Sequence, residues 1–90
     1  MVSRTTARFR RAYAGLPERV RAQAREAYRT FARDPQHPGL RLKPVHPSRP
    51  VYSARVGLGY RALAVREDGD VWVWFWIGSH AEYDRLLAGL

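Results

Sequence analysis

Two arginines inside predicted strands are the first residues in this chain whose placement could serve chemistry. Arg55 lies in the segment VYSARV and Arg61 in YRALAV, and an unpaired charge inside a strand of a small domain is costly unless it reaches a partner. A guanidinium offers a rigid fork of donors that suits phosphate, and it stays charged at any working pH. Two interpretations therefore stand side by side: phosphate-binding arginines, or arginines that reach water or an acid such as Asp84.

His80 is the candidate for proton transfer. It follows the apolar run VWVWFWI after only Gly78 and Ser79. Ser79 and Glu82 have the spacing of a capping box, which predicts a helix that begins here with His80 in its first turn. The positive end of a helix opposes protonation, so the imidazole would stay neutral and able to act as a base, and the free N–H groups would favour a phosphate oxygen. The alternative is that His80 only packs at the edge of the tryptophan cluster.

Three further residues are candidates on weaker grounds. Arg41 and Lys43 alternate with leucines in LRLKPV, which is the pattern of a half-buried strand, so we expect both cations on its polar face, where they could hold phosphate. Tyr83 shares one face of the predicted last helix with Leu86 and Leu87. This spacing predicts a ring in the core with its hydroxyl at the rim.

The other residues that could carry chemistry do not form a motif. We find no phosphate-binding loop, paired-carboxylate motif or Ser/His/Asp grouping, and the chain has no cysteine. His37, His46 and His80 are too scattered to suggest a metal site, and the first two lie among prolines and glycines in predicted loops. We therefore expect neither a metal ion nor another cofactor.

These side chains need elements to position them, and the N-terminal third predicts two amphipathic helices. Apolar residues at helical spacing predict a first helix over residues 5–16, which Gly15 and Pro17 end. A second helix is predicted from Pro17 to residue 33, with an apolar stripe on one side and arginines on another, and Asp34 with Pro35 closes it. Such a helical hairpin needs a sheet on which to bury its apolar faces.

The rest of the chain predicts that sheet. Strands are expected at residues 40–45, 51–56, 60–65 and 71–77. The last three follow one another through short turns, so antiparallel order is the simplest expectation. The run 71–77 is apolar throughout and should be central and covered on both faces, whereas Ala62 and Ala64 should let the helices pack closely. We expect an α+β fold with an N-terminal helical hairpin on one face of a four-stranded antiparallel sheet, followed by a short C-terminal helix.

Length and charge limit the class of protein and its partners. Ninety residues suffice for one domain, spanning 1–90, and no segment has the length of a membrane span or the pattern of a signal peptide. We therefore expect a cytoplasmic protein. The net charge of +8 is uneven: residues 1–33 carry +7, residues 34–66 carry +5 and residues 67–90 carry −4. So basic a surface favours phosphate-rich or acidic partners, although fifteen arginines to one lysine can also reflect codon bias.

The order of residues resembles that of the RelE/ParE superfamily of bacterial type II toxin–antitoxin toxins. The resemblance covers nearly the whole chain and is carried by LPERVRAQAREAYRTFARDPQHPGLRLKPV, YSARVGLGYRAL and WFWIGSHAEYDRLL. Its most telling part is the R-V-G…Y-R stretch in one hairpin, followed by an apolar strand that ends in I-G-S-H-x-x-Y. The implied fold is a helical hairpin on an antiparallel sheet with a concave opposite face, in agreement with the prediction above.

The resemblance also implies roles for individual residues. Many such toxins cut mRNA in the ribosomal A site. Arg61 matches the strand arginine of those nucleases, Arg55 lies near a second basic position, and His80 lies where they have Arg or His. Tyr83 would stand for their C-terminal tyrosine, at a shorter spacing. Some members begin with a strand before the first helix, but MVSRTT is too short and polar to predict one here.

The leading hypothesis is therefore a toxin endoribonuclease that acts on mRNA at the ribosome, by attack of a ribose 2′-OH on the adjacent phosphate. His80 would be the general base or acid, Arg61 and Arg55 would stabilise the developing charge, and Lys43 would position phosphate. The resemblance implies a cognate antitoxin, which would lay an acidic or amphipathic helix across the toxin. The alternatives are a non-catalytic ParE-like toxin that inhibits DNA gyrase and a plain RNA-binding or ribosome-associated module.

Overall fold

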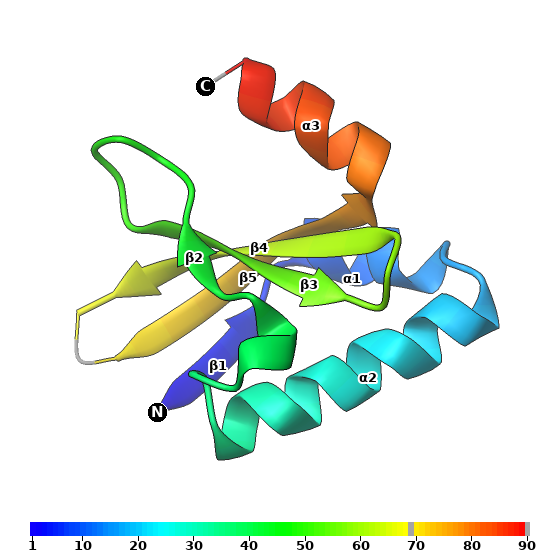
Figure 1. Ribbon diagram of the computed structural model, residues 1–90, viewed down its shortest axis with the longest axis horizontal. Coiled ribbons are helices and arrows are strands. Elements are labelled where there is room, and N and C mark those ends of the chain that lie inside the picture. The colour runs from blue at the N-terminus through cyan, green and yellow to red at the C-terminus, as the bar shows by residue number, and fades with distance from the viewer. Residues whose placement is uncertain (69, 90) are drawn as a thin grey trace.

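One twisted sheet lies between two helical layers in the computed structural model, which describes residues 1–68 and 70–89 (Figure 1). The sheet order over these residues is β1-β5-β4-β3-β2. Helices α1 and α2 cover one face of the sheet, and α3 packs on the other. The elements are β1 (Val2–Thr5), α1 (Ala7–Ala14), α2 (Glu18–Arg33), the short 3-10 helix η1 (Pro38–Leu40), β2 (Lys43–Pro44), β3 (Val51–Val56), β4 (Tyr60–Glu67), β5 (Val71–Ser79) and α3 (His80–Ala88).

The predicted helical hairpin is confirmed, with α1 slightly shorter than expected. The Thr6 hydroxyl accepts a hydrogen bond from the Phe9 N–H at 3.1 Å, so the first helix begins after Thr6 because its free N–H groups find a cap there. The second helix follows Pro17 and ends before Asp34, whose backbone is extended as expected for a residue that precedes a proline. No helix within residues 1–68 and 70–89 has the length and apolar character needed to cross a membrane.

The expectation that the N-terminus forms no strand is wrong. Residues Val2–Thr5 form β1, which pairs in parallel with β5. The amide of Val2 donates to the Asp70 carbonyl at 3.2 Å, and the amide of Thr6 donates to the Trp74 carbonyl at 3.0 Å. The pairing satisfies backbone N–H and C=O groups at the edge of β5. It depends on the backbone of β1 and does not require burial of its side chains, most of which are exposed. The sheet is therefore five-stranded and mixed, while the α+β class is confirmed.

The strand predicted at residues 40–45 is largely wrong. Leu40 ends η1, and Arg41 follows in the left-handed region with φ 48°. Only Lys43–Pro44 pair with β3, since a proline has no N–H to donate to a ladder. The alternation of leucines and cations in this segment reflects packing rather than a strand, because Leu40 is buried in the core on the hairpin face.

The face of the sheet under the helical hairpin holds the larger core. Phe31 of α2 lies edge-on against both Trp72 and Trp74, with ring centroids 5.2 Å apart in each pair. Ala62 and Ala64 of β4 belong to the same cluster, which confirms that small residues admit the helices closely. Burial of one side chain such as Phe31 contributes about 1.5–3 kcal/mol to the stability of the fold. The packing of Phe31 is therefore a main contact between α2 and the sheet.

The opposite face is covered by α3. Tyr83 packs with Leu63 and Val51 in a second buried cluster, to which Phe75 and Trp76 contribute. A bulge makes this possible: Trp76 pairs with Leu63 while Trp74 pairs with Ala64, which leaves Phe75 as the extra residue of β5. The apolar run 71–77 is therefore covered on both faces, as predicted.

Candidate functional site

Arg55 and Arg61 lie opposite each other on neighbouring strands. The register of β3 and β4 pairs Arg55 with Arg61, and directly opposed residues of an antiparallel pair share a face. Their neighbours Ala54 and Ala62 belong to the core under the hairpin, so strand alternation places both arginines on the α3 face. Sequence reasoning did not anticipate this pairing, but the alternation in YRALAV correctly placed Arg61 on the face opposite Ala62 and Ala64.

Each arginine is half-buried and makes one hydrogen bond to a nearby carbonyl. Arg55 Nε donates to the Gly57 carbonyl at 3.0 Å, and Arg61 Nη1 donates to the Tyr60 carbonyl at 2.9 Å. Neither arginine forms an ion pair within residues 1–68 and 70–89. The contact with Asp84 that the sequence left open does not occur, so most of the donors of both guanidinium groups remain available to an anion.

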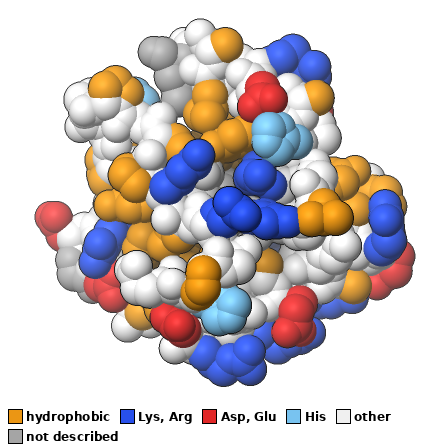
Figure 2. Space-filling model, in the orientation of Figure 1, with side chains coloured by type: hydrophobic (Ala, Val, Ile, Leu, Met, Phe, Trp, Pro, Cys, Tyr) orange, Lys and Arg blue, Asp and Glu red, His pale blue; other side chains and the backbone are white. Residues whose placement is uncertain are grey.

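Lys43 extends this cationic surface, whereas Arg41 does not lie on the same ladder. Lys43 pairs with Ser53, and Ser53 lies two residues before Arg55 on the same face of β3. Arg41 caps η1 outside the strand. Figure 2 shows Lys and Arg side chains gathered over the middle of the sheet below α3, with a histidine and an acidic side chain directly above them. We call Lys43, Arg55 and Arg61 the cationic floor.

The start of α3 holds His80 on the same side of the sheet as the cationic floor. The predicted capping box is present: the Glu82 amide donates to Ser79 Oγ at 3.2 Å, and the Ser79 amide donates to Glu82 Oε1 at 2.9 Å. Hydrogen bonding by Ser79, chiefly from its backbone N–H, lowers the pKa of the Glu82 carboxyl from its ordinary value. The His80 amide donates to the Gly59 carbonyl at 2.8 Å. This bond ties the helix start to the turn that joins β3 and β4.

The imidazole of His80 contacts the next turn of its own helix. Its Nδ1 lies 3.1 Å from Oδ2 of Asp84, and its ring centroid lies 5.8 Å from that of Tyr83 in an edge-on arrangement. The side chain is 47% exposed, so it remains open to a ligand. Sequence reasoning missed Asp84 as a partner of His80, although the i, i+4 spacing on a predicted helix is a signal that could have found it.

Tyr83 is turned into the protein. It is only 5% exposed, and its hydroxyl donates to Ser53 Oγ at 3.2 Å in a buried contact. The ring is in the core, as predicted, but the prediction that its hydroxyl lies at the rim is wrong. The hydrogen bond joins α3 to β3 directly beneath His80.

The other two histidines stabilise loops. His37 Nδ1 accepts from the Gly39 amide at 3.0 Å, and His46 Nδ1 accepts from the amides of Ser48 and Arg49 at 3.1 and 2.9 Å. Each ring thus satisfies backbone donors in a tight turn. Within residues 1–68 and 70–89, no group of three or more His, Asp or Glu residues could hold a metal ion.

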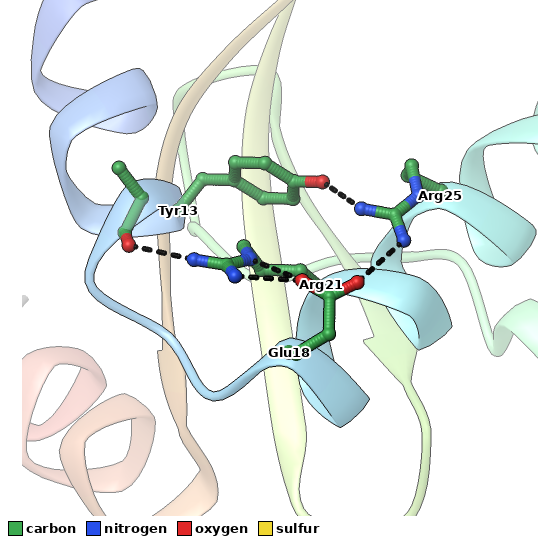
Figure 3. Close-up of polar contacts among 5 residues, drawn as sticks. Tyr13, Glu18, Arg21 and Arg25 are labelled. Carbon is green, nitrogen blue, oxygen red and sulfur yellow. Dashed lines mark hydrogen bonds and ion pairs between the residues drawn. The ribbon is translucent and has the colours of Figure 1, made fainter.

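Several arginines of the hairpin are used in local ion pairs. Glu18 accepts from Arg21 at 2.6 Å and from Arg25 at 3.0 Å, while Arg25 also donates to the Tyr13 hydroxyl at 2.8 Å (Figure 3). The hydrogen bond from Arg21, followed by that from Arg25, lowers the pKa of the exposed Glu18 carboxyl. Arg21 also reaches the Ala14 carbonyl. These contacts hold the two helices of the hairpin together at their junction.

An apolar cavity lies on the hairpin side of the sheet, and His80 is not among its lining residues. It has a volume of about 690 Å³ between β1, α1, α2 and the sheet, and its walls are mostly apolar, with Phe9 and Ile77 among them. Two buried polar atoms in its lining residues, Ser3 Oγ and Trp74 Nε1, lack a hydrogen-bond partner among the described residues. The cavity offers a place for apolar groups, whereas His80, Arg55 and Arg61 lie on the α3 side of the sheet.

Comparison with known proteins assigns the fold and the family. Residues 18–85 match the model of the family described as ParE-like toxin domain. The toxin–antitoxin complex RelBE2 from Mycobacterium tuberculosis contains a chain that is 30% identical, with a TM-score of 0.69 over 88% of this chain and 96% of that one. A search of curated proteins gives no significant match.

Two further structures share the fold at lower identity. YafQ from E. coli superposes with a TM-score of 0.72 at 12% identity, over 90% of this chain and 94% of that one. The intact E. coli RelBE toxin–antitoxin complex contains a chain with a TM-score of 0.64 at 18% identity, over 86% of this chain and 93% of that one. At these identities the likeness concerns the fold.

Proposed function

Because this chain belongs to the ParE-like toxin domain family, within the RelE/ParE superfamily of toxin–antitoxin toxins, we propose that it is an mRNA endoribonuclease that acts at the ribosome. The observation that carries the proposal is the placement of His80, at the start of α3, on the same side of the sheet as Arg55 and Arg61. A partly exposed imidazole on the same side of the sheet as two guanidinium groups that lack acidic partners among the described residues is suited to proton transfer beside a phosphate.

The proposed reaction is an internal transfer at phosphorus. The ribose 2′-OH gives its proton to His80 and its oxygen attacks the adjacent phosphorus, while the bond to the 5′-oxygen of the next nucleotide breaks. The products are a 2′,3′-cyclic phosphate and a 5′-hydroxyl, whose proton comes from solvent or from the protonated imidazole. Arg55 and Arg61 stabilise the additional negative charge of the phosphorane, and Lys43 holds a neighbouring phosphate.

The substitution His80→Ala tests this proposal. We expect the single-turnover rate of mRNA cleavage in a translating extract to fall by about 10²- to 10⁴-fold, which is the usual contribution of a general base. His37→Ala, which removes an exposed histidine from a loop, is the matched control and should cleave like the wild type. Undiminished cleavage by His80→Ala would refute the role of this residue.

The same pair of variants separates the alternatives. A gyrase inhibitor would block DNA supercoiling in vitro without cutting RNA, and a plain RNA-binding module would bind RNA with neither effect. Neither behaviour depends on a base at position 80. Measurement of cleavage, supercoiling and RNA binding with the same preparations therefore distinguishes the three functions.

We further propose that a cognate antitoxin neutralises this protein. The support comes from the related chains, which are found in toxin–antitoxin complexes, and from the net charge of +8, which favours an acidic partner. The apolar cavity between β1, α1, α2 and the sheet is lined in part by Arg4 and Arg10, neither of which forms an ion pair among the described residues. Apolar side chains flanked by carboxylates are the chemistry that this lining would accept.

A further inference from the structure

One carboxylate, that of Asp84, contacts a ring nitrogen of His80. The capping box and the bond to Gly59 fix the backbone of His80, but they leave its side-chain torsions free. Two side chains approach the ring itself: Tyr83 meets it edge-on at 5.8 Å between centroids, and Asp84 approaches Nδ1 at 3.1 Å. Of these two contacts, only that with Asp84 acts on a particular ring nitrogen.

The contact also selects a tautomer. An ionised carboxylate can accept hydrogen bonds but cannot donate one, so a bond between Asp84 Oδ2 and His80 Nδ1 requires that Nδ1 carry the proton. In the neutral ring, Nε2 then keeps its lone pair. Because the two nitrogens lie on different edges of the ring, the atom left able to accept a proton is the one turned away from Asp84.

We infer that Asp84 is a positioning residue that holds neutral His80 as its Nδ1–H tautomer and so leaves Nε2 as the atom that takes the proton from the attacking hydroxyl. The inference rests on the proposed nuclease function and adds to it the residue that orients the base. When Nε2 takes the proton, the ring becomes a cation beside the carboxylate of Asp84, and that pairing favours the transfer. Asp84 itself neither gains nor loses a proton.

A purely structural role predicts something different. Exposed pairs at i, i+4 on a helix contribute little to stability, and Asp84 is 64% exposed. If the contact only supported the helix, its removal would slightly lower stability and leave the proton distribution of the ring unchanged. The position of the ring proton therefore separates the two roles, whether or not the protein cleaves RNA.

Nitrogen-15 NMR of the imidazole provides that measurement. At a pH where His80 is neutral, we expect the wild type to carry its proton on Nδ1. Asp84→Ala should shift the ring towards the Nε2–H form, and Asp84→Glu, which keeps a carboxylate within reach, should retain the wild-type pattern. Asp68→Asn, which removes one exposed carboxylate at the far end of the β4–β5 hairpin, controls for charge. An Nε2–H ring in the wild type, or a ring unaffected by Asp84→Ala, would overturn the inference.

Cleavage kinetics form the second arm of the experiment. We expect Asp84→Ala to lower kcat by about tenfold, as a part of the contribution of the base, with KM little changed and with recovery in Asp84→Glu. A wild type that holds the Nδ1–H tautomer but does not cleave would refute the proposed function, since positioning would then serve no reaction. Full kcat in Asp84→Ala, in a wild type that does cleave, would instead refute the catalytic part of this inference.

Discussion

At the scale of single residues, the same residue type serves quite different purposes in this protein. His37 and His46 accept hydrogen bonds from the backbone of their own turns, so their rings are occupied by local structure. His80 instead contacts the carboxylate of Asp84, and its side chain is 47% exposed. The difference lies in the neighbours, because an imidazole that already accepts a backbone N–H at one nitrogen has less freedom to serve a ligand.

Tyr83 gives a prediction at this scale. Tyr83→Phe removes the hydroxyl that bonds to buried Ser53, and it should lower the free energy of unfolding by about 1–3 kcal/mol, because Ser53 Oγ would be left buried without a partner. We expect kcat to stay within about twofold of the wild type, since the hydroxyl faces the sheet and is not among the groups to which proton transfer is assigned. Urea unfolding and cleavage rates test both parts.

A double substitution is the control for Tyr83. Tyr83→Phe combined with Ser53→Ala removes both polar partners, and it should recover part of the lost stability. A fall in kcat of Tyr83→Phe as large as that of His80→Ala would contradict the prediction. Such a fall would mean that the Tyr83 hydroxyl takes part in the reaction, as the family resemblance implies.

At the scale of elements, the capping box decides where the last strand ends and where α3 begins. The chain is apolar up to Ile77, and β5 could continue if hydrophobicity alone determined its length. Ser79 instead satisfies the free amide of Glu82, and Glu82 satisfies the amide of Ser79. The turn into α3 follows directly, and it places His80 rather than a strand residue beside the turn at Gly59.

The pH dependence of the capping box is a second prediction. Hydrogen bonds from Ser79 lower the pKa of Glu82 in the folded state, so the ionised carboxylate stabilises the fold above its unfolded pKa of about 4.3, and this contribution is lost as the pH falls through the folded pKa. We expect Glu82→Ala to cost about 0.5–1 kcal/mol at pH 7. The difference from wild type should shrink towards pH 3 in urea unfolding.

The control for this prediction is Asp68→Ala, which removes an exposed carboxylate from the turn after β4. A pH-independent gap between Glu82→Ala and the wild type would mean that the carboxylate charge plays no part in the cap. The comparison with Asp68→Ala corrects for the general effect of net charge on the acid stability of a basic protein.

At the scale of the whole molecule, the cationic floor and the arginines of the hairpin lie on opposite sides of the sheet. Several hairpin arginines pair with Glu18 or Glu26, while Arg55 and Arg61 have no ion pair among the described residues. Charge at the floor is therefore less neutralised by the protein itself than charge in these hairpin pairs. The affinity of RNA that binds the cationic floor should therefore depend strongly on these charges.

Lys43 provides the test at this scale. In a His80→Ala background that prevents cleavage, Lys43→Ala should weaken the binding of single-stranded RNA to a similar degree for all sequences. It should also reduce the slope of log affinity against log salt by about 0.7, the value expected for one phosphate contact to a single strand. Fluorescence anisotropy across a salt series measures both quantities.

The matched control is Arg19→Ala, which removes one exposed cation from α2 in the helical hairpin. We expect its effect on the slope to be much smaller. An equal effect of the two substitutions would mean that RNA is attracted by diffuse charge over the whole surface, without a preferred place at the floor.

Local sequence was enough to predict the elements whose signals act over a few residues. The hairpin followed from apolar spacing and from Pro17 and Asp34, and the start of α3 followed from Ser79 and Glu82, because caps and helix periodicity depend on neighbouring residues in the chain. The sequence could not reveal β1, since its pairing satisfies the edge of a strand almost seventy residues away. The spacing of Leu40 and Leu42 predicted a strand wrongly. Over so short a segment, apolar residues buried from a loop and apolar residues of a strand give the same alternating pattern.

The sequence by itself determined which groups could serve chemistry: His80 at a helix start, and arginines inside strands, where a charge must reach water, an acid or an anionic ligand. Only the tertiary structure decided how they combine. The register of β3 and β4 set Arg55 opposite Arg61, and the packing of α3 on the sheet turned the Tyr83 hydroxyl inward to Ser53. These outcomes depend on packing and pairing between distant segments, and such contacts leave no periodic signal in the residues that make them.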